Sequence, residues 1–346
     1  MNLLAILSRC AVLALLMLAA CSVPPAHADP PLDERQALHL LDRLGYGPGP
    51  DAVARVRAMG AAAYVDGQLA PPPLPRYLEM RLGELADPGT PPGEEALLRA
   101  IASPRQLEEV LVDFWVGWFV KGQERGIDTA DTARAALRPH VLGRYAQLAE
   151  QARSRGAAVA DTDERAALRA LAGHFVTTPS ANLLRSLAQV WDATDGDQRA
   201  VLRALLTRRE FLAPAQWKTR RKDDFRFVAS AVRASGVWVE NVAPLAEFLR
   251  RPMRPAGRAA FVERLAGGRL ALKMAPPRPQ GYASSAPPLR AGVAGGPPTG
   301  ALAQPGPVLM EAPTPSAIAM AAAALSEPAD PGGLRQLLNS EDFLRY

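Results

Sequence analysis

The chain has 346 residues, of which 48% are hydrophobic, and it carries 40 basic against 35 acidic residues, for a formal net charge of +5. This hydrophobic content excludes a wholly disordered chain and is enough for one large core or two smaller ones. The basic excess is small and comes mainly from arginine, since the chain has only four lysines. We therefore do not expect a nucleic-acid partner.

The first thirty residues have the pattern of a secretory signal peptide. Arg9 is followed by an apolar run from Cys10 to Ala20. This run is too short for a membrane-spanning helix, which needs roughly 20 apolar residues. We expect residues 1–28 to direct export to the bacterial cell envelope and then to be removed.

Two cleavage signals overlap at the end of this segment. Residues 18–21 (L-A-A-C) form a lipobox, in which Cys21 would receive a diacylglycerol and anchor the protein to the membrane. Residues 26–28 (A-H-A) have the small-x-small pattern of ordinary secretory cleavage, which would leave a periplasmic protein without Cys21. The lipobox directly follows the apolar run, and this favours the lipoprotein. Because Cys10 and Cys21 are the only cysteines, the mature chain would contain no disulfide and no reactive thiol.

Nearly every patterned segment beyond the leader has helical periodicity, and none shows sustained strand alternation with hairpin turns. We predict an all-α fold: an irregular multi-helix domain over residues 33–267, a Pro/Gly/Ala-rich flexible segment over 275–331, and a helix over 332–346 that docks on the main domain. The clearest helix carries Leu107, Val110, Leu111, Phe114, Trp115, Trp118 and Phe119 on one face. Other predicted helices span 34–44, 50–59, 61–69, 129–136, 139–153, 163–174, 181–193, 198–211, 225–234 and 243–250.

A short sequence occurs twice. Residues 202–212 (L-R-A-L-L-T-R-R-E-F-L) and 334–344 (L-R-Q-L-L-N-S-E-D-F-L) match at the leucines, at the arginine and at the phenylalanine. Two copies at this separation do not indicate a solenoid. They suggest a reused helix and turn, whose terminal Phe211 or Phe343 inserts into the core.

The densest basic stretch runs from Lys218 to Lys222 and is followed at once by Asp223 and Asp224. The two carboxylates would partly neutralise this stretch at a phosphate surface. We interpret it as a solvated face, and contact with anionic lipid headgroups or glycan is the alternative.

The sequence offers few residues for catalysis or metal binding. The expected mature chain has three histidines, His39, His140 and His174, without an H-E-x-x-H motif, a cysteine pair or an Asp-rich loop. We expect no metal site and no cofactor. His140 follows Pro139 at a predicted helix start, and near Arg138 and Asp113 it could act as a base. A cap or filler role for His140 and a salt bridge from Asp113 to Arg138 or another nearby arginine are the favoured interpretations.

Five motifs occur in an order that resembles the domain-of-unknown-function 1800 family, whose members are exported bacterial proteins. They are residues 41–48 (L-D-R-L-G-Y-G-P), 112–115 (V-D-F-W), 137–143 (L-R-P-H-V-L-G), 195–206 (D-G-D-Q-R-A-V-L-R-A-L-L) and 225–236 (F-R-F-V-A-S-A-V-R-A-S-G). The family's typical histidine after V-D-F-W would fall at Trp118. Its long Glu-, Arg- and His-rich insertion is missing between Gly143 and Asp195. The resemblance therefore implies a shortened, divergent member that has lost any site built from those residues.

These observations favour an exported, non-catalytic helical envelope protein that binds or scaffolds a protein partner. The alternative is a hydrolase-like enzyme that acts on an exported polymer or phosphoester and uses Asp113, Arg138 and His140. The two differ in structure, because only the enzyme requires these three side chains to converge in one cleft.

Overall fold

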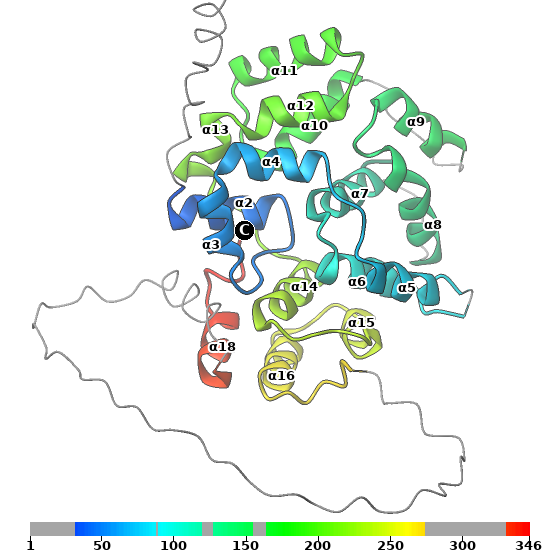
Figure 1. Ribbon diagram of the computed structural model, residues 1–346, viewed down its shortest axis with the longest axis vertical. Helices are drawn as coiled ribbons and strands as arrows, with labels where there is room; N and C mark the ends of the chain where they lie inside the picture. Colours follow the sequence, from blue (N-terminus) through cyan, green and yellow to red (C-terminus); the bar gives the residue numbers. More distant parts are fainter. Residues whose placement is uncertain (1–31, 88, 120–126, 155–163, 274–329) are drawn as a thin grey trace, which may run out of the picture.

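The computed structural model describes residues 32–87, 89–119, 127–154, 164–273 and 330–346 (Figure 1). These residues confirm the predicted all-α fold, since no strand occurs among them and their only β-type pairings are two isolated bridges. The predicted signal peptide, Cys21 and the Pro/Gly/Ala-rich segment up to residue 329 lie outside this part of the chain. None of the helices described is both long enough and apolar enough to span a membrane.

The helices are short and follow one another closely. In chain order they are α2 (Glu34–Arg43), α3 (Ala52–Met59), α4 (Ala61–Leu69), α5 (Arg76–Leu85), α6 (Glu94–Ala102), α7 (Gln106–Phe119), α8 (Ile127–Leu137), the 3-10 helix η1 (Arg138–His140), α9 (Tyr145–Ser154), α10 (Glu164–Phe175), α11 (Ala181–Ala193), α12 (Gln198–Leu206), α13 (Arg209–Leu212), the 3-10 helix η2 (Pro214–Gln216), α14 (Asp224–Ser235), α15 (Ala243–Leu249), α16 (Pro255–Ala266) and α18 (Pro331–Leu338).

The apolar side chains form two cores. The first is built by α2, α3, α4 and α7 to α13, and the second by α5, α6, α14, α15, α16 and α18. Figure 1 shows α14, α15, α16 and α18 in the lower part of the view, with α10 to α13 at the top. Helix α7 serves both cores, because Leu107, Leu111 and Trp115 belong to the first while Val110 belongs to the second. The helix predicted from its apolar face is thus a central element of the fold.

A polar interface lies between the two cores, formed by the buried residues Asp42, Arg43, Gln106, Lys222 and Arg226. The Arg226 guanidinium on α14 donates to the backbone carbonyls of Asp42 and Gly45, at 2.9 and 2.7 Å. The Gln106 side chain on α7 accepts from the backbone N–H of Tyr46 and donates to the carbonyl of Ala100. These hydrogen bonds join the turn after α2 to helices of the second core, and they satisfy backbone groups that the tight turn leaves unpaired.

The predicted helix over 139–153 is confirmed only from Tyr145 onward, and its predicted start is wrong. Its first residues belong to the 3-10 helix η1, and α9 begins only at Tyr145. Between them the backbone pairs with a distant loop: the N–H of Gln198 donates to the carbonyl of Gly143 and the N–H of Tyr145 to the carbonyl of Gly196, each at 3.0 Å. Groups engaged in these long-range bonds are not available to a continuous helix.

The phenylalanine of each copy of the repeated sequence is buried, as predicted. Phe211 follows α12 and is fully buried in the first core, and Phe343 follows α18 and is buried in the second. The chain after α18 then runs back to the polar interface, where the backbones of residues 344–346 and 220–222 hydrogen-bond to each other.

Candidate functional site

The structure does not bring Asp113, Arg138 and His140 together. Asp113 accepts a hydrogen bond from the Tyr46 hydroxyl and forms an ion pair with Arg134, at 3.1 Å. The predicted salt bridge of Asp113 is therefore confirmed, with Arg134 as its partner rather than Arg138. Arg138 instead pairs with the buried carboxylate of Glu109, at 3.2 Å.

His140 lies half-buried at the end of η1. Its backbone carbonyl accepts hydrogen bonds from the Gly143 N–H and the Gln198 side chain, at 2.9 and 3.4 Å. No hydrogen bond or ion pair joins any two of Asp113, Arg138 and His140 in the described part of the chain. Through these contacts the backbone of His140 connects η1 to the start of α12.

The other two histidines pack against aromatic rings. His39 on α2 makes a 2.9 Å hydrogen bond from its Nε2 to the carbonyl of Phe211, and burial together with nearby Arg43 lowers its pKa to about 4. His174 lies between Phe114 and Phe175, and burial holds its pKa well below the ordinary value. The described residues contain no group of three or more His, Cys, Asp or Glu side chains that could hold a metal ion.

The lowered pKa of His39 predicts a specific pH dependence of stability. As the pH falls below 6.5, His39 becomes protonated in the unfolded chain, whereas in the folded chain it stays neutral until about pH 4. The free energy of unfolding therefore falls between pH 6.5 and pH 4. The pKa difference is worth about 3 kcal/mol. A His39→Gln variant retains a donor for the Phe211 carbonyl but does not titrate, and its unfolding free energy should fall by about 3 kcal/mol less. Urea unfolding between pH 4 and 7 tests this, and parallel pH profiles would contradict it.

Five cationic side chains gather at the polar interface, beside the buried carboxylate of Asp42. We call them the basic cluster: Arg43, Lys218, Arg220, Lys222 and Arg226. The Lys218 ammonium forms an ion pair with Asp42 at 2.7 Å. The Lys222 ammonium lies 3.9 Å from the centre of the Phe343 ring.

The side chains of the basic cluster lie close together, and some of their N–H groups have no hydrogen-bond acceptor among the described residues. Burial alone would raise the pKa of Asp42, but Lys218, Lys222 and Arg226 together hold it below its ordinary value. Burial also lowers the pKa of Lys222 to about 7. Arg43 is 1% exposed, and neither its Nε nor its Nη1 has a hydrogen-bond acceptor among the described residues. The carboxylate of Asp42 thus lies among four cations and Lys222, which is only partly protonated at neutral pH, and this excess of positive charge favours the approach of an anion.

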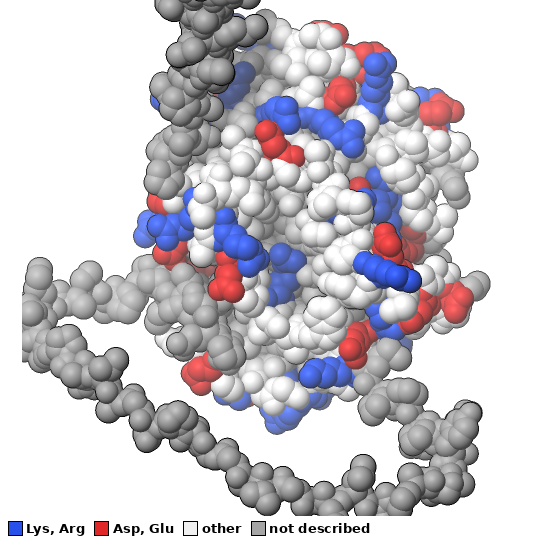
Figure 2. Space-filling view, in the orientation of Figure 1, with Lys and Arg blue, Asp and Glu red and all other residues white. Residues whose placement is uncertain are grey.

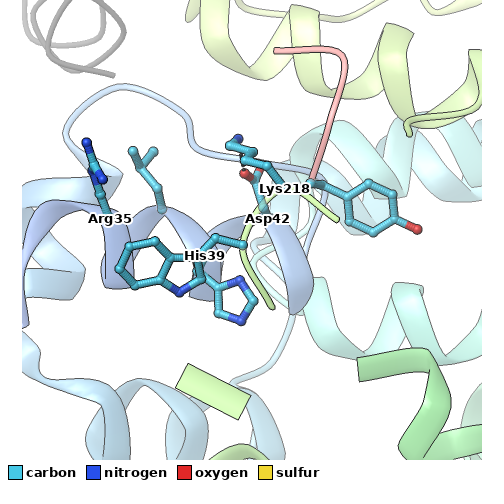
Figure 3. A pocket seen from close by; sticks show the side chains of 7 residues that line it. Arg35, His39, Asp42 and Lys218 are labelled. Carbon is cyan, nitrogen blue, oxygen red and sulfur yellow. Dashed lines mark hydrogen bonds and ion pairs between the residues drawn. The ribbon is translucent and has the colours of Figure 1, made fainter. Parts of the chain in front are cut away.

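A cavity of about 170 Å³ opens beside the basic cluster (Figure 3). Four of its lining residues share one face of α2, because Leu38, His39 and Asp42 follow Arg35 by three, four and seven residues. Trp217, Lys218 and Tyr346 complete the lining. Figure 2 shows this face of the molecule hollowed near its centre, with blue Lys or Arg atoms in the hollow, close to the chain end marked C in Figure 1. The cavity combines apolar walls with cations, as ligand-binding sites commonly do.

The motifs quoted from the sequence meet in space at two joints. At the first, α14 donates from Arg226 to the turn of residues 41–48, and Arg233 on the same helix donates to the carbonyl of Gly47 at 2.9 Å. At the second, residues 137–143 meet residues 195–206 through the hydrogen bonds of Gly143 described above. The V-D-F-W motif also belongs to the first joint, because its Asp113 accepts a hydrogen bond from the Tyr46 hydroxyl. The first joint links the two cores, and the second lies within the first core.

Comparison with known protein families supports this grouping. The model of the family described as "Protein of unknown function (DUF1800)" matches residues 39–159 and 164–287, well over half of the chain. The chain belongs to this family. No curated protein and no solved structure matches it.

In this DUF1800 protein, the position at which the resemblance implies a histidine is held by a tryptophan on α7. Trp118 is half-buried and packs against the first core. The indole adds apolar contact there and cannot serve as an acid, a base or a metal ligand at neutral pH. An imidazole-based site at this point of α7 is therefore not available to the chain.

The basic cluster was not predicted from the sequence, and the interpretation of residues 218–222 as a solvated face is wrong for Lys222. Lys222 is 5% exposed, because the backbone of Leu344 accepts its N–H at 2.8 Å and brings Phe343 over its side chain. Asp42 lies in the family motif of residues 41–48, but no feature of that motif shows which lysine it meets 176 residues later. The density of charge from Lys218 to Lys222 was the available signal.

Proposed function

We propose that this protein is an exported, non-catalytic protein of the bacterial cell envelope that binds a protein partner through one exposed aromatic surface. The predicted signal peptide supports export, and the lipobox supports attachment to the membrane through Cys21. The observation that carries the binding function is the clustering of exposed apolar side chains.

The aromatic surface consists of Tyr77, Met80, Val237 and Trp238. Five large hydrophobic side chains are exposed in the described part of the chain, and these are four of them; the fifth is Met59 on α3. Trp238 is 51% exposed and Met80 61%. Single exposed apolar residues are ordinary, but a contiguous group with aromatic members is typical of a surface that binds a partner.

The aromatic surface is held in a fixed shape. Tyr77 lies on α5 and Trp238 in the connection from α14 to α15, and their ring centres are 4.8 Å apart. The Arg81 guanidinium on α5 donates to the carbonyl of Glu240, which ties this connection to the helix. Rings that are already fixed lose little conformational entropy when a partner covers them, so the arrangement favours binding.

The structure gives less support to the alternative, a hydrolase-like enzyme acting on an exported polymer or phosphoester. Such an enzyme needs Asp113, Arg138 and His140 around one reacting group. Asp113 is held by Tyr46 and Arg134, and Arg138 by Glu109. These contacts position helices, and for this reason we favour binding over catalysis.

A photo-reactive amino acid at Met80 tests the proposed function in cells that make the protein with its signal peptide. We expect a covalent adduct to one envelope protein, and we expect Trp238→Ser to abolish it by removing the largest apolar contact of the aromatic surface. Met59→Ser changes an equally exposed apolar residue outside that surface and is the matched control. Adducts that are equal in both variants, or that join only two copies of this chain, would contradict the proposal.

The intact mass of the protein recovered from the same envelopes tests the proposed anchor. A mature chain that starts at a diacylglycerol-modified Cys21 supports the lipoprotein, and a chain that starts at Asp29 shows the ordinary secretory cleavage instead.

A further inference from the structure

We propose that the cavity along α2 binds a small organic carboxylate whose apolar body is about the size of a benzene ring. This site is separate from the aromatic surface and does not depend on the partner proposed above. The inference rests on the size of the cavity, on its apolar middle and on the unequal charges at its two ends.

The size of the cavity limits the ligand. Its volume is about 170 Å³. Apolar cavities of roughly 150 Å³ accept one benzene molecule, so this cavity holds a body of one ring or a short hydrocarbon chain. It is smaller than the roughly 300 to 1,000 Å³ typical of sites for drug-sized ligands and cofactors, so a small ligand fits it better than a nucleotide.

The middle of the cavity suits a flat apolar body. Leu38 and the Trp217 indole are among its lining residues, and Leu38 is otherwise buried. His39 lies between the two charged ends, and its Nε2 is hydrogen-bonded to the Phe211 carbonyl. An aryl or alkyl group placed here would gain apolar contacts without leaving a buried polar group unpaired.

The two ends of the cavity differ in the charge they offer. Figure 3 shows Arg35 at one end and Asp42 beside Lys218 at the other. These ends are about 10 Å apart, because Arg35 and Asp42 are separated by two turns of α2. The Lys218 ammonium is already engaged with Asp42 and with the carbonyl of Arg345. Arg35 makes no hydrogen bond or ion pair with any described residue, so its guanidinium is free to bind a carboxylate through two parallel N–H donors.

The basic cluster selects the sign of the ligand. Lys218 lines the cavity, and Arg43, Arg220, Arg226 and the partly protonated Lys222 lie close to Asp42 at the same end. The resulting positive potential attracts an anion into the cavity and repels a ligand that carries an ammonium group, and Arg35 offers the donors that are not already engaged. The same potential would make a neutral ligand of identical shape a weaker one.

Calorimetric titration of the mature protein with four probes tests the proposal. We expect benzoate to bind in the millimolar range or tighter. Benzamide, which has the same shape without the charge, should bind at least about tenfold more weakly, since one charge-assisted hydrogen bond is worth at least that factor. Benzylamine and inorganic phosphate should give no binding, because the first has the wrong charge and the second lacks the apolar body. Absence of benzoate binding, or equal binding of benzamide, would overturn the proposal.

Two variants locate the binding site. Arg35→Gln should weaken benzoate binding about tenfold without changing the unfolding midpoint, because Arg35 is exposed and contributes no contact to the fold. Arg254→Gln removes an exposed arginine at the start of α16 and is the matched control. Leu38→Trp should fill the cavity and abolish binding, and circular dichroism would show whether it folds. Unchanged affinity in Arg35→Gln would show that benzoate binds elsewhere and would refute the site even if Leu38→Trp did not fold.

Discussion

Replacing Asp42 by asparagine is expected to lower the free energy of unfolding by about 3 to 5 kcal/mol, because it leaves buried cations without their carboxylate. Asp42 is 2% exposed and pairs with Lys218 at 2.7 Å. Its charge also acts on Lys222, whose ammonium is buried beside it. The substitution keeps the shape of the side chain, so the loss measures charge rather than packing. Urea unfolding at pH 7 gives the difference directly.

Two further variants separate this explanation from a general sensitivity to mutation. Asp195→Asn breaks an exposed ion pair with Arg144 and should cost less than about 1 kcal/mol. Adding Lys218→Met to Asp42→Asn removes one of the uncompensated cations and should restore part of the lost stability. If adding Lys218→Met lowers the free energy of unfolding of Asp42→Asn further, instead of raising it, the electrostatic account of the basic cluster is wrong.

Replacing Trp115 by alanine is expected to cost about 3 to 5 kcal/mol for a different reason, the loss of packing in the first core. Trp115 is completely buried, and its ring lies 5.5 Å from that of Tyr145 and 5.7 Å from that of Phe119. Its indole N–H has no hydrogen-bond partner among the described residues, so the variant removes apolar contact without breaking a hydrogen bond. Thermal and urea unfolding measure the loss.

The control for Trp115 is Trp238→Ala, in which the same side chain is removed from a half-exposed position. Little surface is withdrawn from water at that position, so the change in unfolding free energy should be small. Similar losses in the two variants would show that α7 is not the centre of the first core.

Helical periodicity predicted much of this fold because a helix that buries one face must repeat its apolar residues at that spacing. The predicted segments 61–69 and 181–193 agree with α4 and α11, and the stripe from Leu107 to Phe119 lies within α7. Helices α5, α6 and α16 were not predicted. The reason for α5 is visible in its burial, because only Leu78 and Leu82 of its ten residues are buried and the stripe is too short to stand out.

The sequence could not predict the contacts that build the candidate sites, because they join residues far apart in the chain. Asp42 meets Lys218 across 176 positions, and Lys222 is covered by a segment that returns more than a hundred residues later. Local patterns report which residues face a core, but not which charged groups meet where two cores join. The residues selected for catalysis, Asp113, Arg138 and His140, were drawn from motifs whose contacts here position helices and loops.

A crystal structure of the mature protein grown with benzoate would test most directly whether the cavity along α2, beside the polar interface, is a binding site. The account predicts a carboxylate within hydrogen-bonding distance of the Arg35 guanidinium and a ring that packs on Leu38 and Trp217. A cavity closed by its own side chains, or benzoate bound instead beside Asp113 and His140, would contradict it.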